Sequence, residues 1–291
     1  MFRSLLRLSH PVYLLLAALC YSLGVSIANY LGLTFRAASF WLGLGGVVLA
    51  QLSMNLLAEV FRPANEPLVD NESRKDRLSL RNNALSISYA CLAVNAVIAF
   101  LLYIDHNLSY HSILFIGISL LLVLFYSISP IRLLNRGYGE LILAVHLAYV
   151  IPSIGFLLQA DDYHRLLFSI AVPLTALALA YFIVLDFPSF ASDRKYERRT
   201  LLSLLGWERL IPLHHGLIIA AYLLFAAVSL FGYSFSLLWP AFLTLPFAIL
   251  QIILMRFISL GGRPNWTLLT VTALAVFGLT AYFLILAFLL R

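Results

Sequence analysis

The sequence predicts an all-α integral membrane protein built from nine transmembrane helices. Composition is the first observation behind this prediction, because 62% of the 291 residues are hydrophobic and only 11% are charged. A soluble domain carries about 25% charged residues, so this chain has less than half the usual complement. The second observation is that the apolar residues form long blocks, and a block of about 18 or more can cross a bilayer as a helix.

The chain divides into nine apolar blocks, each of which predicts one membrane-spanning helix. They cover residues 11–34, 37–60, 84–104, 110–128, 140–159, 167–187, 210–232, 236–259 and 267–290. No separate soluble domain stands out between them. We therefore expect residues 1–291 to form a single transmembrane domain.

The distribution of basic residues supports this division and predicts an orientation. With nine alternating helices, every Lys and Arg except Arg36, Arg165 and Arg291 falls on the side of the N-terminus. Loops rich in Lys and Arg stay in the cytoplasm. We therefore expect a multi-pass protein of the cell (inner) membrane with a cytoplasmic N-terminus and an external C-terminus. The net charge of +6 then flanks the spans, which favours contacts with lipid or diphosphate, and we expect no nucleic-acid partner.

Two long polar connections, 61–83 and 188–209, lie on the predicted cytoplasmic side and are expected to be active-site loops. The first follows Glu59, which has Asn55 four residues earlier on the same helical face. Ionisable side chains at membrane depth are costly and are therefore candidates for function. A solvated loop beside a snorkelling Glu59 is the alternative, but dense polarity on both connections favours a central cavity open to the cytoplasmic side.

The second connection combines carboxylates with a basic cluster. Asp186 closes an apolar block, Asp193 follows seven residues later, and the cations Arg194, Lys195, Arg198 and Arg199 come directly after it. Carboxylate oxygens suit Mg²⁺, and arginine donates paired hydrogen bonds to phosphate. Such a cluster at a helix end can hold a divalent metal ion and a phosphate-bearing ligand.

A third segment on the same side, YSISPIRLLNRGYGEL (126–141), adds further arginines. Pro130 ends one apolar block, and Gly137 and Gly139 permit a tight turn before the next. Arg132 and Arg136 point toward the headgroup region, where they either bind phosphate or act only as topology anchors.

Two of these segments resemble motifs of the UbiA superfamily of intramembrane prenyltransferases. In 126–141, the Tyr-Ser, the Pro, the Arg-Leu and the Arg-Gly-x-Gly-Glu of that family recur. The segment LDFPSFASDRKYERRTLLSLLG resembles the second aspartate motif of menaquinone-type members. Asp186 takes the acidic position before Phe-Pro, Asp193 matches the last aspartate, and Arg199 opens the Arg-Thr-Leu tail.

The resemblance implies a reaction and a set of site residues. It implies that Mg²⁺ on two acidic motifs grips the diphosphate of a polyprenyl donor, and that an aromatic or quinone-precursor-like lipophilic acceptor is then alkylated. The residues expected to be catalytic are Asp186, Asp193 and Glu59. The expected metal ligands are Asp186, Asp193, Glu59 and Glu66, with Asp70 as a further acidic residue. The expected diphosphate ligands are Arg62, Arg77, Arg81, Arg132, Arg136, Arg194, Lys195 and Arg199.

The chain also departs from the family pattern. Ser189 stands where the second motif has its central aspartate, and Arg62 takes the place of a metal-binding aspartate in the first motif. An arginine there repels Mg²⁺. Three functions are therefore open: a prenyltransferase with a reduced acidic set, a related isoprenoid cyclase, or a protein that binds an isoprenoid or quinone lipid without catalysis. His146, in the middle of a span, either touches an aromatic acceptor or bonds a neighbouring helix.

Overall fold

The computed structural model describes residues 2–63, 66–69, 72–105 and 108–291. Within those ranges the chain is helical with connecting turns and contains no strand. Nine of the described helical segments are long and apolar enough to cross a membrane, which confirms the predicted fold class. The short helices α1 (Phe2–Leu8) and α9 (Leu201–Leu205) lie outside these spans.

The spans follow the predicted apolar blocks closely. Four consist of one α-helix each, namely α2 (Pro11–Tyr30), α3 (Ala37–Val60), α4 (Arg74–Ile104) and α5 (Tyr110–Ser127). The fifth joins α6 (Gly139–Val145) to α7 (Ile151–Leu157) through a π-helical turn. The remaining spans are formed by α8 (Arg165–Lys195), α10 (Trp207–Ala227), α11 (Phe235–Leu238) with α12 (Leu245–Ser259), and α13 (Trp266–Leu274) with α14 (Thr280–Leu289).

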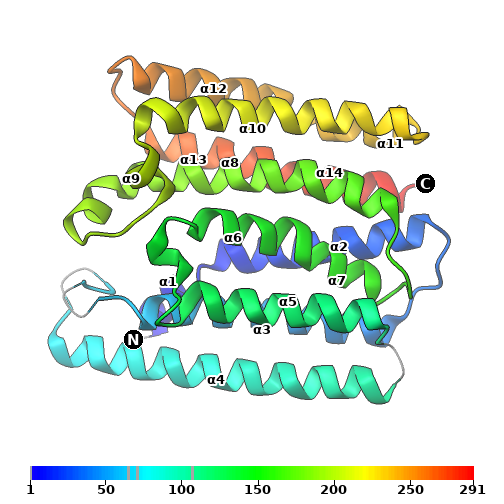
Figure 1. The fold of residues 1–291 in the computed structure, drawn as a ribbon, viewed down its shortest axis with the longest axis horizontal. Coiled ribbons are helices and arrows are strands. Elements are labelled where there is room, and N and C mark those ends of the chain that lie inside the picture. Colours follow the sequence, from blue (N-terminus) through cyan, green and yellow to red (C-terminus); the bar gives the residue numbers. More distant parts are fainter. Residues whose placement is uncertain (1, 64–65, 70–71, 106–107) are drawn as a thin grey trace.

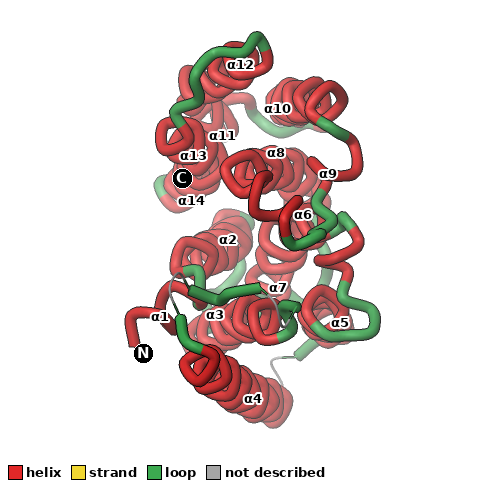
Figure 2. The backbone as a smooth tube through the Cα atoms, turned by 90° about the vertical axis from the view of Figure 1, so that its left-hand side faces the viewer, coloured by secondary structure: helices red, strands yellow, loops and turns green. Residues whose placement is uncertain are grey.

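The spans run side by side along the long axis of the molecule (Figure 1). Seen end-on in Figure 2, α4 and α12 lie at opposite edges, with α2, α6, α7 and α8 between them. Burial follows this order, since 83% of the α6–α7 span is buried but only 17% of the α4 span. We call the end at which α3, α5, α8 and α12 finish the basic end, because the connections there carry most of the arginines.

Two glycines let α2 and α7 touch along their backbones in the middle of the bundle. A Cβ atom added at Gly24 would overlap the carbonyl oxygen of Pro152, and one added at Gly155 would overlap that of Tyr21. Small residues at such crossings are the usual means by which membrane helices approach closely. This contact fixes α2 at the centre, with its first turns at the basic end.

The two segments expected to be loops are partly helical, so their predicted bounds need correction. Helix α4 already begins at Arg74, because Ser73 and Asp76 form a reciprocal cap with bonds of 3.1 and 3.2 Å. Helix α8 continues through Pro188 to Lys195. Two cations in its last turn complement the helix dipole, so the helix extends beyond its apolar part.

Candidate active site

A polar cavity of about 250 Å³ lies at the basic end of the bundle. Side chains reach it from α2, α3, α6, α8 and the connections after α5 and α8, among them Tyr13, Glu59, Arg132, Glu140 and Asp186. Segments far apart in the sequence therefore meet here. The cavity brings together the three stretches that the sequence singled out.

Glu59 enters the cavity as one half of an ion pair. It is 5% exposed, and its Oε1 accepts a hydrogen bond of 2.6 Å from Arg62, one turn later. The ring of His10 lies 3.3 Å from the same oxygen. Glu59 is thus held by Arg62 and His10.

Arg62 and Arg198 tie the first acidic segment to the second. Arg62 lies 3.1 Å from Glu66, and Arg198 pairs with Glu66 through two of its nitrogens, one at 3.1 Å. Arg198 also lies 3.3 Å from Asp193 Oδ1. We call Glu59, Arg62, Glu66, Asp193 and Arg198 the arginine–carboxylate cluster.

Arg198 carries positive charge into this cluster at neutral pH. Burial, with a smaller contribution from the neighbouring Arg62, lowers the pKa of Arg198 to about 10. That value remains well above 7, so the guanidinium stays protonated. Arg198 was not expected among the diphosphate ligands, although it belongs to the same run of cations as Arg194, Lys195 and Arg199.

Ser189 supports Asp193 from within the same helix. Its hydroxyl donates to Asp193 Oδ2 at 2.6 Å, and the Asp186 carbonyl oxygen lies 3.1 Å from the same Oγ. Both oxygens of Asp193 are therefore engaged, one by Ser189 and one by Arg198. The serine in place of the family aspartate thus donates a hydrogen bond instead of offering a further carboxylate.

Asp186 and Glu140 form the part of the cavity that the arginines leave free. Glu140 lies in the first turn of α6, and its Oε1 accepts from the Leu201 backbone N–H at 3.0 Å. Asp186 lies next to it. Glu140 Oε2, Asp186 Oδ2 and Glu59 Oε2 are all buried without a hydrogen-bond partner among the described residues. Glu140 was overlooked as a site residue, although an acidic residue directly after a glycine turn, in an otherwise apolar span, was a usable signal.

The predicted basic residues divide into two groups. Arg62 and Arg132 line the cavity; Arg132 donates to the Ala58 carbonyl at 3.3 Å, and burial lowers its pKa. Arg81 instead donates to the carbonyls of Arg62 and Pro63 at 3.0 and 2.9 Å, which holds the chain after α3.

The other predicted cations lie outside the cavity. Arg77 pairs with Glu72 at 2.5 Å, and the exposed Arg136 donates to the Pro130 carbonyl at 3.3 Å. Lys195 lies over the ring of Tyr196. Arg194 and Arg199 border an adjoining depression beside α9, which Arg198 also lines.

The acidic residues do not fit the predicted four-carboxylate metal set. Among the described residues, no three Asp, Glu, His or Cys side chains are grouped so that they could hold a metal ion. Glu59, Glu66 and Asp193 are paired with arginines, and Asp70 lies outside the described residues. The unpartnered oxygens of Asp186 and Glu140 do fit a single hard cation, because Mg²⁺ commonly uses one or two protein carboxylates.

His146 does not line this cavity. Its ring lies 2.9 Å from Ser119 of α5 and 3.0 Å from Gln51 of α3. Of the two roles considered for it, the structure shows the bond to neighbouring helices.

Solved structures with the same fold include homologues of UbiA. The structure of a UbiA homologue from Aeropyrum pernix K1 aligns with a TM-score of 0.65 at 16% identity, over 93% of this chain and 96% of that one. Digeranylgeranylglyceryl phosphate synthase aligns with a TM-score of 0.69 at 14% identity, over 99% and 97%. A UbiA homologue from Archaeoglobus fulgidus, bound to GPP and Mg²⁺, aligns with a TM-score of 0.62 at 16% identity, over 97% and 99%.

Sequence comparison gives the family directly. No curated protein matches the chain, but the model of the UbiA prenyltransferase family matches residues 17–264. That range includes both acidic segments and every lining residue of the polar cavity except His10 and Tyr13. The chain therefore belongs to the UbiA prenyltransferase family, whose members are intramembrane prenyltransferases.

Proposed function

We propose that this protein moves a polyprenyl group from its diphosphate to a lipophilic acceptor with an aromatic or quinone-precursor-like ring. One observation carries the proposal: arginines, free carboxylate oxygens and aromatic side chains share one cavity inside a bundle of membrane-spanning helices. A diphosphate needs the arginines, and an allylic cation needs the aromatic side chains. The GPP and Mg²⁺ bound to the Archaeoglobus fulgidus homologue support the same ligand class.

The donor diphosphate is assigned to Arg62, Arg132 and Arg198. All three line the cavity, and the planar guanidinium donates two parallel hydrogen bonds to phosphate. Arg62 and Arg198 are held by Glu59, Glu66 and Asp193. The carboxylates therefore preorganise the cations that bind the ligand.

A single Mg²⁺ is assigned to Asp186 and Glu140, which line the cavity and each carry one buried oxygen without a partner among the described residues. When bound, this ion supplies positive charge to the departing diphosphate. The arginine–carboxylate cluster takes the place of a second metal site, because the remaining acids are already paired with its arginines.

The reaction then follows from the groups in the cavity. The allylic C–O bond breaks, and its electron pair leaves with the diphosphate toward the arginines. Tyr13 and Tyr126 line the cavity, and their aromatic rings are assigned the stabilisation of the allylic cation. An electron pair of the acceptor ring forms the new C–C bond, and Glu59 Oε2, which is buried and unpartnered, takes the ring proton.

Orientation completes the proposal. The basic end is assigned to the cytoplasmic side of the cell membrane, because it carries the excess of Lys and Arg. The cavity then opens toward the compartment that supplies soluble diphosphates.

The proposal is tested with protein purified in detergent, labelled prenyl diphosphates, and a panel of aromatic and quinone-like acceptors. We expect prenylated product with Mg²⁺, and little product when Asp186→Asn or Glu140→Gln replaces a proposed metal ligand. Mg²⁺ should also raise the thermal unfolding midpoint of the wild type but not of either variant. Arg263→Ala, an exposed arginine at the same end, is the matched control and should behave as wild type.

Binding of the diphosphate without turnover of any acceptor would contradict the proposed reaction. Release of a cyclised hydrocarbon in place of a prenylated acceptor would contradict it as well. A Mg²⁺-induced shift that survives in both carboxylate variants would contradict the proposed metal ligands alone.

A further inference from the structure

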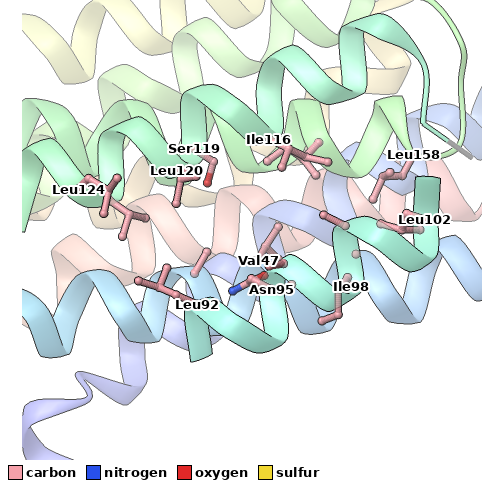
Figure 3. A pocket seen from close by; sticks show the side chains of 17 residues that line it. Val47, Leu92, Asn95, Ile98, Leu102, Ile116, Ser119, Leu120, Leu124 and Leu158 are labelled. Atoms are coloured by element: carbon pink, nitrogen blue, oxygen red, sulfur yellow. The ribbon is translucent and has the colours of Figure 1, made fainter. Parts of the chain in front are cut away.

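A second, apolar pocket of about 420 Å³ lies between α3, α4 and α5, near the middle of the spans. Figure 3 shows its lining, which is aliphatic except for two polar side chains, Asn95 of α4 and Ser119 of α5. It shares no lining residue with the polar cavity. The pocket is therefore a separate site, and it does not continue the space in which the donor diphosphate is proposed to bind.

Ser119 ends a buried chain of hydrogen bonds that begins beside the polar cavity. Asn55 donates to the Ser9 carbonyl at 2.8 Å, Gln51 donates to Asn55 at 2.8 Å, and His146 Nδ1 lies 3.0 Å from Gln51 Oε1. Ser119 Oγ lies 2.9 Å from His146 Nε2. These side chains are 0 to 5% exposed.

The Ser9 carbonyl at the start of this chain fixes the direction of every hydrogen bond in it. A backbone carbonyl can only accept, so Asn55 and then Gln51 must turn their NH₂ groups along the chain. Gln51 Oε1 therefore accepts the proton on His146 Nδ1. His146 Nε2 then accepts the Ser119 hydroxyl proton, so Ser119 offers the pocket only an acceptor oxygen.

Asn95 offers the complementary group. Its Nδ2 is buried and finds no hydrogen-bond partner among the described residues. A buried donor left unpaired costs about 1–3 kcal/mol. The apolar pocket thus holds one unpaired donor and one free acceptor.

We propose that this pocket binds a lipid-soluble molecule that carries a hydroxyl group and a second oxygen on an otherwise apolar body, such as a long-chain alkoxyphenol. The hydroxyl donates to Ser119, and the second oxygen accepts from Asn95. A volume of about 420 Å³ is within the range of small-molecule sites, which are mostly apolar with a few placed polar groups. Phospholipid headgroups are excluded by depth, because the hydrocarbon core is about 30 Å thick. This inference is independent of the proposed prenyl transfer.

The test uses 4-decyloxyphenol as the probe and decylbenzene, which has the same tail but no oxygen, as its matched control. We expect the phenol to raise the thermal unfolding midpoint of the detergent-solubilised protein and to bind at least tenfold more tightly than decylbenzene. Asn95→Leu and Ser119→Ala should each remove that preference. Val94→Leu, beside Asn95 on the exposed face of α4, should retain it.

Equal binding of the two probes to the wild type would overturn the proposal, because it would show a groove that takes any hydrocarbon tail. A preference for the phenol that survives in Asn95→Leu and Ser119→Ala would overturn it too, since the recognition would then lie elsewhere. Ala99→Leu, which fills the pocket from α4, checks the location and should abolish binding of both probes.

Discussion

Two buried polar systems link the helices of this protein, one through charged side chains and the other through neutral ones. At the basic end, the arginine–carboxylate cluster consists of charged side chains that pair at distances of 2.6 to 3.3 Å. In the middle of the spans, the chain from Asn55 to Ser119 uses amides, a hydroxyl and an imidazole, linked at 2.8 to 3.0 Å. Both systems connect helices that are distant in sequence.

Depth explains the difference between them. A charged side chain at the bilayer centre costs about 2.5–3.5 kcal/mol even on the lowest scales, whereas a neutral polar group costs little once each of its hydrogen bonds is made. Charged side chains cost less free energy at the helix ends, where water and headgroups are near. The ionic system is therefore available to bind an anion, and the neutral system serves to join helices.

Loss of Arg198 should have the largest effect. Arg198→Ala leaves Glu66 and Asp193 short of a cation, and breaking a largely buried pair destabilises by about 3–5 kcal/mol. We expect a clear fall in the thermal unfolding midpoint and at least a 100-fold loss of prenyl transfer, as when a preorganised donor is removed from an active site. Arg198→Lys keeps the charge and separates the two effects: the midpoint should largely return while activity stays low. Full activity of Arg198→Ala would place the diphosphate elsewhere.

Gln51 tests the neutral system and should have an intermediate effect. Gln51→Leu leaves His146 Nδ1–H and Asn55 Oδ1 without partners, at about 1–3 kcal/mol for each unsatisfied group. Unfolding in detergent should show this loss. The double variant Gln51→Leu, His146→Phe removes one of the stranded groups and should be no less stable than Gln51→Leu alone; a further large loss would show that the two side chains act independently.

Ser189 tests the link between the helix and the ionic cluster. Ser189→Ala removes the 2.6 Å bond to Asp193, which is worth about 1.5–3 kcal/mol when the acceptor is charged. We expect a modest loss of stability and a several-fold loss of activity. Ser189→Asp, which restores the family residue, should repel Asp193 and lower stability further, unless added Mg²⁺ compensates. Higher stability of Ser189→Asp without Mg²⁺ would contradict this view of the cluster.

Arg136 should have the smallest effect, although the sequence places it among the diphosphate ligands. It is exposed, and its one hydrogen bond given by the structure goes to the Pro130 carbonyl. Arg136→Ala should change the free energy of unfolding by no more than about 0.5 kcal/mol and leave the affinity for prenyl diphosphate unchanged. A large loss of affinity would show that the segment 131–138 moves over the cavity when the donor binds.

The sequence was sufficient for the fold because membrane helices are encoded locally. Each span needs only a long apolar block. The nine blocks agree with the nine spans among the described residues, and Arg36 and Arg165 lie on the arginine-poor side, as the division into nine spans predicts. The helix ends were less predictable. Polar residues such as those after Pro188 can either continue a helix or form a loop. Which of the two they do depends on capping residues and side-chain hydrogen bonds.

The sequence predicted which residues belong to the candidate site, but not which of them pair with each other. Glu59, Asp186 and Asp193 were expected to meet, and all three line the cavity. Which acid pairs with which arginine depends on contacts between segments 132 residues apart, as for Glu66 and Arg198, and no local pattern encodes that. The local signal of Glu140 was overlooked, and its closeness to Asp186 in particular arises only when α6 packs on α8.

The most direct test of the account is the affinity for a non-reactive thio-analogue of geranyl diphosphate, measured by titration calorimetry with Mg²⁺ and with EDTA. If arginines hold most of the diphosphate, EDTA should weaken binding of the wild type by roughly tenfold, the loss of about 1.4 kcal/mol. Arg62→Ala in EDTA should then show no measurable binding. Binding that vanishes in EDTA but is unchanged by Arg62→Ala would contradict the account, because the metal alone would then hold the ligand.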